Sequence, residues 1–284
     1  MLGRTKEDGV IVDTHVHPLS DDPARYPELP PPGPDWYRGL RLTADECLEQ
    51  MATAGVDQTV LVSAYSVYAY DNSYAADAAA QHPDRFVGVC RIDSLAPDAP
   101  EVLSSWVERR GMRGVRLGTA DARGYPACEC ARQLGIPVSI QVAAEELSQV
   151  GALAEHFPDV NIILDHLAHP RTDDGPPYEA AREFFALRDL SNLHFKFSSM
   201  NLREASAGKS TPRAFVEALV ERFGPGRLLW GSDFPHTRGS ASAPYKDLVD
   251  LARDTLAFLP VGDREQMLAG TARKLYPALV RSQE

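Results

Sequence analysis

The sequence lacks several features that would each assign the chain to a particular class of protein. No stretch approaches the roughly 20 consecutive apolar residues of a membrane-spanning helix. Cysteine occurs only four times, with no sign of a disulfide framework, so free and mostly buried thiols are expected. Residues 1–8 are charged and contain no apolar segment typical of a secretory signal peptide. These absences predict a protein of the reducing cytoplasm that has no membrane partner.

Positive charge is also scarce. The chain of 284 residues has 29 Lys and Arg against 40 Asp and Glu, which gives a net charge of −11. Because nucleic-acid binding needs a basic surface, nucleic acid is not expected as a partner. A small anionic molecule stays compatible with this charge, since a few arginines can dominate one pocket. A hydrophobic content of 44% is that of an ordinary globular protein.

Short apolar runs recur along the whole chain, as expected for buried parallel strands. The predicted strands are Val10–His17, Gln58–Ala64, Phe86–Ile92, Gly114–Gly118, Pro137–Val142, Asn161–Leu167, Leu193–Ser198 and Leu228–Asp233. Segments with caps and stop signals typical of helices lie between most of them. The predicted helices are Ala44–Ala54, Asp98–Arg110, Pro126–Leu134, Ala144–Phe157, Pro177–Arg188, Thr211–Phe223, Tyr245–Leu259 and Asp263–Leu275.

This alternation predicts an α/β protein with a single (β/α)8 TIM-barrel domain over residues 1–284. The alternative is a doubly wound open sheet. No glycine-rich dinucleotide loop follows the first strand, which weakens that alternative. Segment 18–42 is a long proline-rich connection, expected to lie over the barrel mouth, and segment 260–284 is expected to hold the closing helix.

The motif Asp13-Thr14-His15-Val16-His17 ends the first predicted strand. Side chains alternate between the two faces of a strand, so His15 and His17 point the same way, and Asp13 joins them if the strand stays regular. Two imidazoles on one face suit a divalent metal or a proton-transfer site. Two ordinary polar residues in a loop are the simpler alternative.

Further polar residues stand at or just beyond the carboxyl ends of the other predicted strands, where a barrel enzyme places its chemistry. Packing alone does not account for them, because buried charge is costly unless it is paired or used. These candidates are Arg91, Arg116, Gln141, Asp165, His166, Lys196, Asp233 and His236.

Three motifs together resemble the amidohydrolase superfamily. They are Asp13-Thr14-His15-Val16-His17, Leu164-Asp165-His166-Leu167-Ala168-His169-Pro170 and Trp230-Gly231-Ser232-Asp233-Phe234-Pro235. Gly114-Val115-Arg116-Leu117 and the strand around Lys196 are similar to the branch that holds 2-pyrone-4,6-dicarboxylate hydrolases and sugar lactonases. The resemblance spans the chain and implies a barrel whose site includes His15, His17, His166 and Asp233.

The resemblance leaves the metal content open. Metal-bearing relatives often have a histidine on the fifth strand, where this chain has Gln141, which is a weaker and neutral ligand. One divalent metal, zinc by preference, held by His15, His17, His166 and Asp233, is the first expectation. The dicarboxylate hydrolase type implies the alternative, a site that works without metal.

Each candidate has an expected role. Asp233 suits a general base that activates water, and His15, His17 and His166 suit metal ligands or donors to a developing oxyanion. Arg116 suits the grip on a substrate carboxylate, although a buried pair with Asp13 or Asp93 is its structural alternative. Further substrate contacts are expected from Gln141, Arg91, Lys196 and His236.

Together these features predict a hydrolase that opens a small carboxylated cyclic ester, a lactone, or a related acyl substrate. The first alternative is a metal-dependent, non-oxidative decarboxylase of an aromatic or muconate-type acid, which Gln141 disfavours. A barrel that binds a metabolite without turning it over is the second. The expected partner is a small anionic substrate, and a homodimer is compatible with the fold class.

Overall fold

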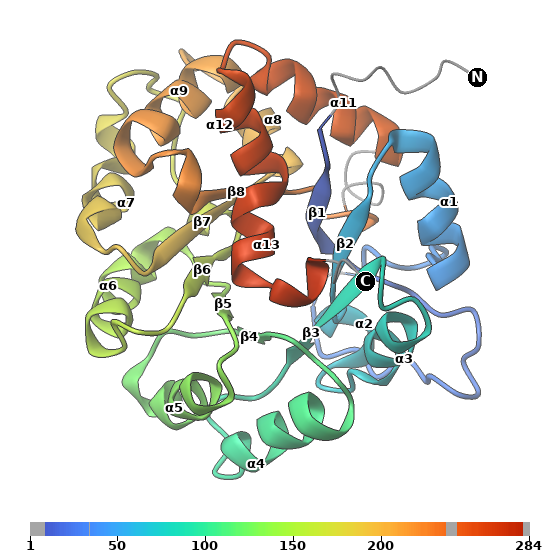
Figure 1. The fold of residues 1–284 in the computed structure, drawn as a ribbon. Helices are drawn as coiled ribbons and strands as arrows, with labels where there is room; N and C mark the ends of the chain where they lie inside the picture. Colours follow the sequence, from blue (N-terminus) through green and yellow to red (C-terminus); the bar gives the residue numbers. More distant parts are fainter. Residues whose placement is uncertain (1–8, 34, 237–242, 281–284) are drawn as a thin grey trace.

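A computed structural model of the chain describes residues 9–33, 35–236 and 243–280. Eight parallel strands follow one another in sequence order, and each is hydrogen-bonded to the next. The helices surround these strands, which confirms the predicted (β/α)8 barrel (Figure 1). The strands are β1 Val12–Val16, β2 Gln58–Val62, β3 Phe86–Arg91, β4 Val115–Leu117, β5 Val138–Ile140, β6 Ile162–Leu164, β7 Leu193–Ser198 and β8 Leu228–Gly231.

The ring closes between β1 and the segment that follows β8. The backbone N–H of Asp233 donates to the carbonyl of His15 at 2.9 Å, and the N–H of His17 donates to the carbonyl of Phe234 at 2.8 Å. These two bonds fix the histidine motif of β1 and Asp233 against each other. The closing seam of the barrel therefore runs through the predicted site.

The outer helices match most of the predicted ones. They are α1 Ala44–Ala54, α2 Tyr65–Tyr68, α3 Ser73–Gln81, α4 Ala99–Ser104, α5 Tyr125–Leu134, α6 Leu147–His156, α7 Arg182–Ala186, α8 Ser199–Glu204, α9 Pro212–Phe223 and α11 Tyr245–Leu256. A wider helical turn, Ser105–Arg109, extends α4. Among the described residues no helix has both the length and the apolar character that crossing a membrane requires.

The sequence prediction missed α2, α3 and α8 and placed the start of α7 too early. The backbone of Tyr178 is left-handed, with φ of 63°, so a regular helix begins only at Arg182. α8 is a six-residue helix that begins directly after β7, where the prediction had only a strand end. The capping box at the start of α1 is confirmed. Thr43 Oγ1 accepts a hydrogen bond from Glu46 N, and Glu46 Oε2 accepts one from Thr43 N.

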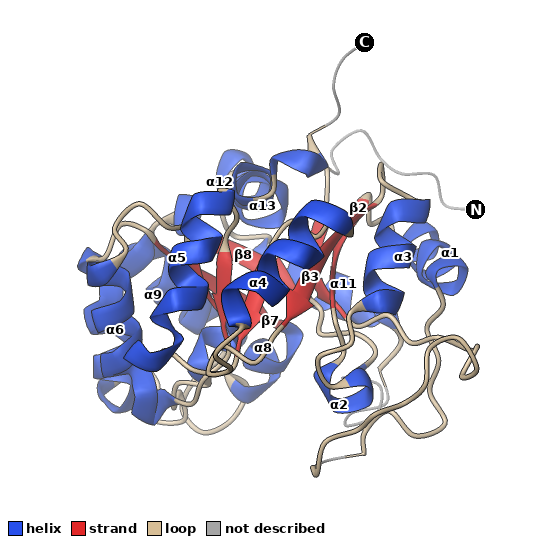
Figure 2. Cartoon of the chain, turned by 90° about the horizontal axis from the view of Figure 1, so that it is seen from below, coloured by secondary structure: helices blue, strands red, loops and turns tan. Residues whose placement is uncertain are grey.

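The C-terminal segment covers one end of the barrel. α12 (Val261–Glu265), a wider turn, α13 (Thr271–Leu275) and a short turn at Pro277–Leu279 form this cover. Figure 2 shows α12 and α13 at one end of the barrel and α2 and α8 at the other. Apolar side chains of the cover pack on inward-facing valines of the strands. The covered end is therefore closed, and the chemistry is left to the opposite end.

The long segment 18–42 is attached to the rest of the fold at several points. Leu19 and Leu42 pair as a short antiparallel bridge at its two ends. In its middle, Arg25 and the hydroxyl of Tyr26 both contact the carboxylate of Asp77 on α3, at 2.8 and 2.7 Å. Its one residue outside the described part is Pro34.

Candidate functional site

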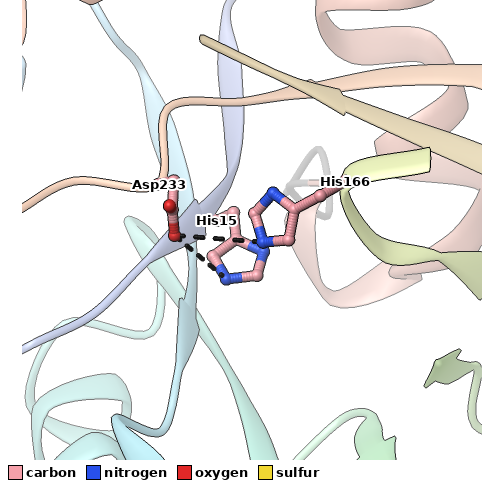
Figure 3. Close-up of side chains that lie close together, drawn as sticks. All are labelled: His15, His166 and Asp233. Carbon is pink, nitrogen blue, oxygen red and sulfur yellow. Dashed lines mark ion pairs between the residues drawn. The ribbon is translucent and has the colours of Figure 1, made fainter. Parts of the chain in front are cut away.

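Four of the predicted site residues converge at the open end of the barrel. Asp233 Oδ1 lies 3.7 Å from His15 Nε2, 3.5 Å from His17 Nε2 and 3.9 Å from His166 Nε2. All four side chains are buried. Figure 3 shows His15, His166 and Asp233 directed toward one another from three different parts of the barrel. The carboxylate is thus the common neighbour of three imidazoles.

Asp13 was expected to share the face of His15 and His17 only in a regular strand, and β1 is not regular. Between Asp13 and Val16 the register of β1 against β2 slips by one residue, which is a β-bulge and breaks the alternation of side chains. The carboxylate of Asp13 instead accepts hydrogen bonds from the backbone N–H of Ser232, at 2.9 Å, and from the hydroxyl of Tyr245, at 2.8 Å. Asp13 therefore ties β1 to the residue that follows β8 and to α11, and its carboxylate is used by these contacts.

Close packing at the seam requires a glycine. A Cβ atom added to Gly231, the last residue of β8, would lie only 2.7 Å from the Cβ of His15. Any larger residue would push His15 away from Asp233. The glycine in the Trp230-Gly231-Ser232-Asp233 motif thus has a steric cause.

A backbone carbonyl fixes the ring of His17. Its Nδ1 lies 2.9 Å from the carbonyl oxygen of Val62, the last residue of β2. Because that oxygen can only accept, Nδ1 carries a proton, and Nε2 faces Asp233 Oδ1 at 3.5 Å. Such a contact behind a histidine is typical of imidazoles that act as ligands or acceptors.

The sequence placed His166 on the sixth predicted strand. In the structure it lies in a turn directly after β6. Four successive residues, 166–169, have left-handed backbones with φ between 51° and 58°. Each non-glycine residue in this conformation costs about 1–2 kcal/mol, so the surrounding structure must hold the turn. Asn201 of α8 does so by donating from Nδ2 to the carbonyl of His166 at 2.9 Å. The sequence prediction missed Asn201, since it missed α8.

Asp233 is held from its other side by His236. Oδ2 of Asp233 lies 2.7 Å from His236 Nδ1, and the Asp233 backbone is itself left-handed, with φ of 63°. Burial raises the pKa of the Asp233 carboxyl, but the neighbouring His166 and the hydrogen bonds to His17 and His236 outweigh it, and the pKa lies well below its usual range. Asp233 is therefore an ionised carboxylate at neutral pH.

A layer of charged residues lies beneath the histidines. Asp165 accepts from Arg116 Nε at 2.7 Å and pairs with Lys196 Nζ at 2.8 Å. The carboxylate and the ammonium are fully buried. Burial raises the pKa of Asp165, but the two cations outweigh it and lower the pKa to about 2. The sequence analysis gave a buried pair of Arg116 with Asp13 or Asp93 as the structural alternative. Arg116 does form a buried pair, but its partner is Asp165.

This charged layer contacts two of the histidines. Arg116 Nη2 lies 3.5 Å from His166 Nε2, and Lys196 Nζ lies 3.4 Å from His15 Nδ1. Burial first, and then Lys196, lower the pKa of His15 well below its usual value. Burial lowers the pKa of His166 to about 4, against the opposing effect of Asp233 and Asp165. Both imidazoles are neutral at pH 7.

Arg91 and Gln141 form a separate pair at the barrel mouth. Arg91 Nη1 donates to Gln141 Oε1 at 2.9 Å, and the guanidinium lies over the ring of Tyr65, 4.9 Å from its centroid. Arg91 is buried, whereas Gln141 is exposed. Gln141 therefore holds an arginine in place, and the structure does not bring its amide into the cluster of imidazoles around Asp233.

The long segment contributes Trp36 to the site. Its ring lies 5.0 Å from that of His236 and 5.9 Å from that of His17, measured between centroids. These two contacts bring Trp36 beside the cluster around Asp233. The sequence shows only that an aromatic residue is present there, since nothing local indicates which ring turns inward.

The geometry of the cluster fits one divalent ion. His15, His166 and Asp233 offer ligand atoms that all lie within 4.8 Å of one another. His15 Nε2 and His17 Nε2 are 3.3 Å apart, and with Asp233 Oδ1 they form a triangle with two further sides of 3.7 and 3.5 Å. A tetrahedral zinc ion, about 2.0–2.1 Å from each nitrogen, needs ligand atoms about 3.3 Å apart. The spacing suits such an ion with little movement.

Comparisons with known proteins agree with this architecture. Residues 12–278 match the Amidohydrolase family (Amidohydro_2). The chain is 26% identical to a 4-sulfomuconolactone hydrolase of Rhizobium radiobacter over 93% of this chain and 89% of that one. It is 27% identical to an L-fucono-1,5-lactonase of Burkholderia ambifaria over 66% and 68%. A solved structure of a candidate 2-pyrone-4,6-dicarboxylic acid hydrolase from Pseudomonas putida superposes with a TM-score of 0.76, at 22% identity, over 96% of this chain and all of that one.

Proposed function

The chain belongs to the amidohydrolase family, and from this premise we propose that it hydrolyses a small carboxylated lactone. The observation that carries the proposal is the placement of Asp233: an ionised carboxylate with one oxygen among three imidazoles and the other held by His236. Related chains that hydrolyse 4-sulfomuconolactone and L-fucono-1,5-lactone support it.

The proposed reaction assigns Asp233 as the general base. Asp233 takes a proton from water, the resulting hydroxide attacks the ester carbonyl, and the ring C–O bond then breaks. The leaving alkoxide receives the proton from Asp233, so the product is an open-chain hydroxy acid, or its keto tautomer where the ring was an enol ester. The new carboxylic acid ionises and releases one proton per turnover at neutral pH.

The imidazoles and Arg116 complete this assignment. Neutral His15 and His166 lie where they can donate to the oxyanion that develops on the carbonyl. The guanidinium of Arg116 lies next to His166 and suits a substrate carboxylate. Arg91, with Gln141, provides a second cation at the mouth, and His236 links Asp233 to the partly exposed edge.

Zinc is the metal that we propose for this site. His15, His17 and Asp233 would hold it, with His166 beside them. Bound there, it would act as a Lewis acid on the carbonyl and lower the pKa of water. Dialysis against a chelator, with zinc content and activity measured together, tests this proposal. Full activity in zinc-free protein would contradict it.

The test of the activity itself uses proton release in a weakly buffered solution. We expect hydrolysis of at least one of 2-pyrone-4,6-dicarboxylate, 4-sulfomuconolactone and L-fucono-1,5-lactone, with one proton released per ring opened. Replacing Asp233 with Asn should lower kcat by about 10²–10⁴-fold, the usual contribution of a positioned base. Asp159→Asn, which changes a carboxylate on the surface, is the matched control and should keep kcat unchanged.

Two results would overturn the proposal. The first is an Asp233→Asn variant that keeps kcat within threefold of the native value on the substrate that the native enzyme hydrolyses. The second is release of carbon dioxide from a substrate acid without ring opening, which would assign the chain to the decarboxylases instead.

A further inference from the structure

We propose that Arg91 is a specificity-determining residue that binds a second anionic group of the substrate, so that the site selects small ring compounds with two carboxylate-type groups. That the ring is a lactone rests on the proposed function. The anion site itself follows from the contacts of Arg91, and molecules that are not hydrolysed can test it.

The position of Arg91 in the barrel is the first step. Arg91 is the last residue of β3 and pairs in register with Arg116 of β4. Residues paired in this way on neighbouring parallel strands point to the same face of the sheet, which here is the interior of the barrel. Val89, two residues earlier on β3, packs in the inner apolar cluster, which agrees with this direction. Two arginines therefore enter the interior from neighbouring strands at the same level.

The second step is that the charge of Arg91 has no counter-charge. Arg91 is only 7% exposed, and among the described residues no carboxylate lies within ion-pairing distance of it. Its Nη1 donates to the neutral amide of Gln141, and its Nε is buried without a hydrogen-bond partner in the part of the chain that the structure describes. Burial first, and then Arg116, lower the pKa of Arg91 to about 10, so the group stays a cation at neutral pH.

This unpaired charge indicates a binding role. A buried cation without a partner destabilises the fold, whereas an anionic ligand that supplies the missing charge turns the same cation into an attractive contact. Arg116 differs, because it already pairs with Asp165 at 2.7 Å. Of the two arginines, Arg91 is therefore the one that lacks an anion in the protein itself.

The third step is that Arg91 is held in place without a ligand. The buried side chain of Asn72 binds its backbone twice: Nδ2 donates to the Arg91 carbonyl at 3.0 Å, and Oδ1 accepts from the Arg91 N–H at 2.6 Å. The ring of Tyr65 and the amide of Gln141 fix the guanidinium. Little conformational freedom is left to lose when an anion binds, which favours affinity.

Gly118 leaves the space that the guanidinium occupies. A Cβ atom added to Gly118, directly after β4, would lie 2.5 Å from Arg91 Nη2. Gly118 and Gln141 are both exposed, so the guanidinium lies at the boundary between the buried interior and the open mouth. A ligand that enters the mouth can therefore reach Arg91.

These features fit an oxyanion on a small ring. A guanidinium offers a planar fork of N–H donors that matches the two oxygens of a carboxylate, and Gln141 takes only a donor of Nη1. Neighbouring strands are about 4.8 Å apart, so Arg116 and Arg91 suit two anionic groups carried by one ring. Among lactones, 2-pyrone-4,6-dicarboxylate should therefore be preferred to L-fucono-1,5-lactone, which carries no anionic group.

The test measures the binding of two inert probes by isothermal titration calorimetry. Isophthalate is a planar ring with two carboxylates, and benzoate is the same ring with one. Since one charge-assisted contact changes affinity by about tenfold or more, we expect the native protein to bind isophthalate at least tenfold more tightly than benzoate. This comparison needs no variant.

Two variants assign the second contact to Arg91. Arg91→Gln removes the charge and should weaken isophthalate binding about tenfold while benzoate binding changes less than threefold. Gly118→Ala should weaken isophthalate binding in the same way, because its methyl group displaces the flexible end of Arg91. Arg123→Gln is the matched control, because it removes the same charge from an exposed ion pair with Asp121 in the loop after β4 and should change neither affinity.

The melting temperature separates binding from a structural role. Removing an uncompensated buried charge should leave the Tm of Arg91→Gln unchanged or raise it, whereas a structural cation would lower it. A native protein that does not prefer isophthalate, equal losses for both probes in Arg91→Gln, or a lower Tm without a selective loss would each overturn the proposal.

Failure of the proposed hydrolysis has a different signature. An Arg91-dependent preference for isophthalate in a protein that opens no lactone would support the anion site and contradict the hydrolysis. Lactone hydrolysis in a protein without that preference would do the opposite.

Discussion

The buried pairing of Asp165 yields a sharp prediction about stability. Replacing Asp165 with Asn removes the negative charge that lies 2.7 Å from Arg116 Nε and 2.8 Å from Lys196 Nζ. The two cations are then buried without compensation. Removal of one partner from a buried ion pair typically destabilises a protein by about 3–5 kcal/mol, and we expect this range for Asp165→Asn.

The same magnitude can be expressed as a melting temperature. At about 2.1 cal/mol/K per residue, the entropy of unfolding of a 284-residue chain is roughly 0.6 kcal/mol/K. A loss of about 3–5 kcal/mol therefore lowers Tm by roughly 5–8 °C. Urea denaturation followed by far-UV circular dichroism measures the free energy of unfolding, and a thermal scan measures Tm.

Two further variants isolate the cause. Lys196→Met added to Asp165→Asn removes one of the uncompensated cations, so the double variant should be more stable than the sum of the single effects by about 1–3 kcal/mol. Asp159→Asn breaks an exposed contact with Arg132 and should cost less than about 1 kcal/mol. A cost for Asp165→Asn as small as that of Asp159→Asn would refute the reasoning.

Three further predictions concern substrate binding and local structure. Arg116→Lys should raise KM for a carboxylated lactone at least tenfold in initial-rate assays while kcat changes less, since an ammonium cannot grip a carboxylate with two bonds; an unchanged KM would exclude this contact. Trp36→Ala should raise KM without lowering Tm, since the ring lies over His17 and His236 from a half-buried position; a fall in Tm at unchanged KM would indicate a structural role. Thr43→Ala should cost about 1 kcal/mol in urea denaturation and leave kcat unchanged, since it removes only the cap of α1; a loss of kcat would contradict this.

The barrel itself could be predicted because its strands carry their own signal. All eight apolar runs became strands, and they pair in sequence order. The prediction placed no helix between β2 and β3, although the alanine-rich segment of α3 has a high helix propensity. Local patterns therefore determined the strands and the capped helices, and failed for helices too short to show a clear period, such as α2 and α8.

The site was predictable as a set of residues but not as an arrangement. Position at the ends of strands was enough to name His15, His17, His166 and Asp233. It could not show that Asp165 would turn from the strand end toward Arg116 and Lys196, because those contacts join residues 31 and 49 positions apart. Backbone irregularity also escapes sequence patterns.

The irregular parts of the backbone lie at the candidate site. The bulge in β1 turns Asp13 outward and keeps His15 inward, and left-handed backbones carry both His166 and Asp233. Non-glycine residues in this conformation persist only where their surroundings hold them, as Asn201 and the seam of the barrel do here. The structure is strained at the residues that we assign to catalysis, which is where stability is commonly exchanged for geometry.

The balance of charge beneath the histidines links this geometry to the proposed reaction. Arg116 and Lys196 together face the single carboxylate of Asp165, so the buried layer carries one net positive charge. Above it, His15 and His166 are neutral and Asp233 is negative. An oxyanion formed among the imidazoles therefore lies above a fixed excess of positive charge in a region shielded from water, where electrostatic stabilisation is strong. The positive charge beneath the imidazoles therefore favours an anionic transition state at the position where the carbonyl oxygen of the substrate would lie.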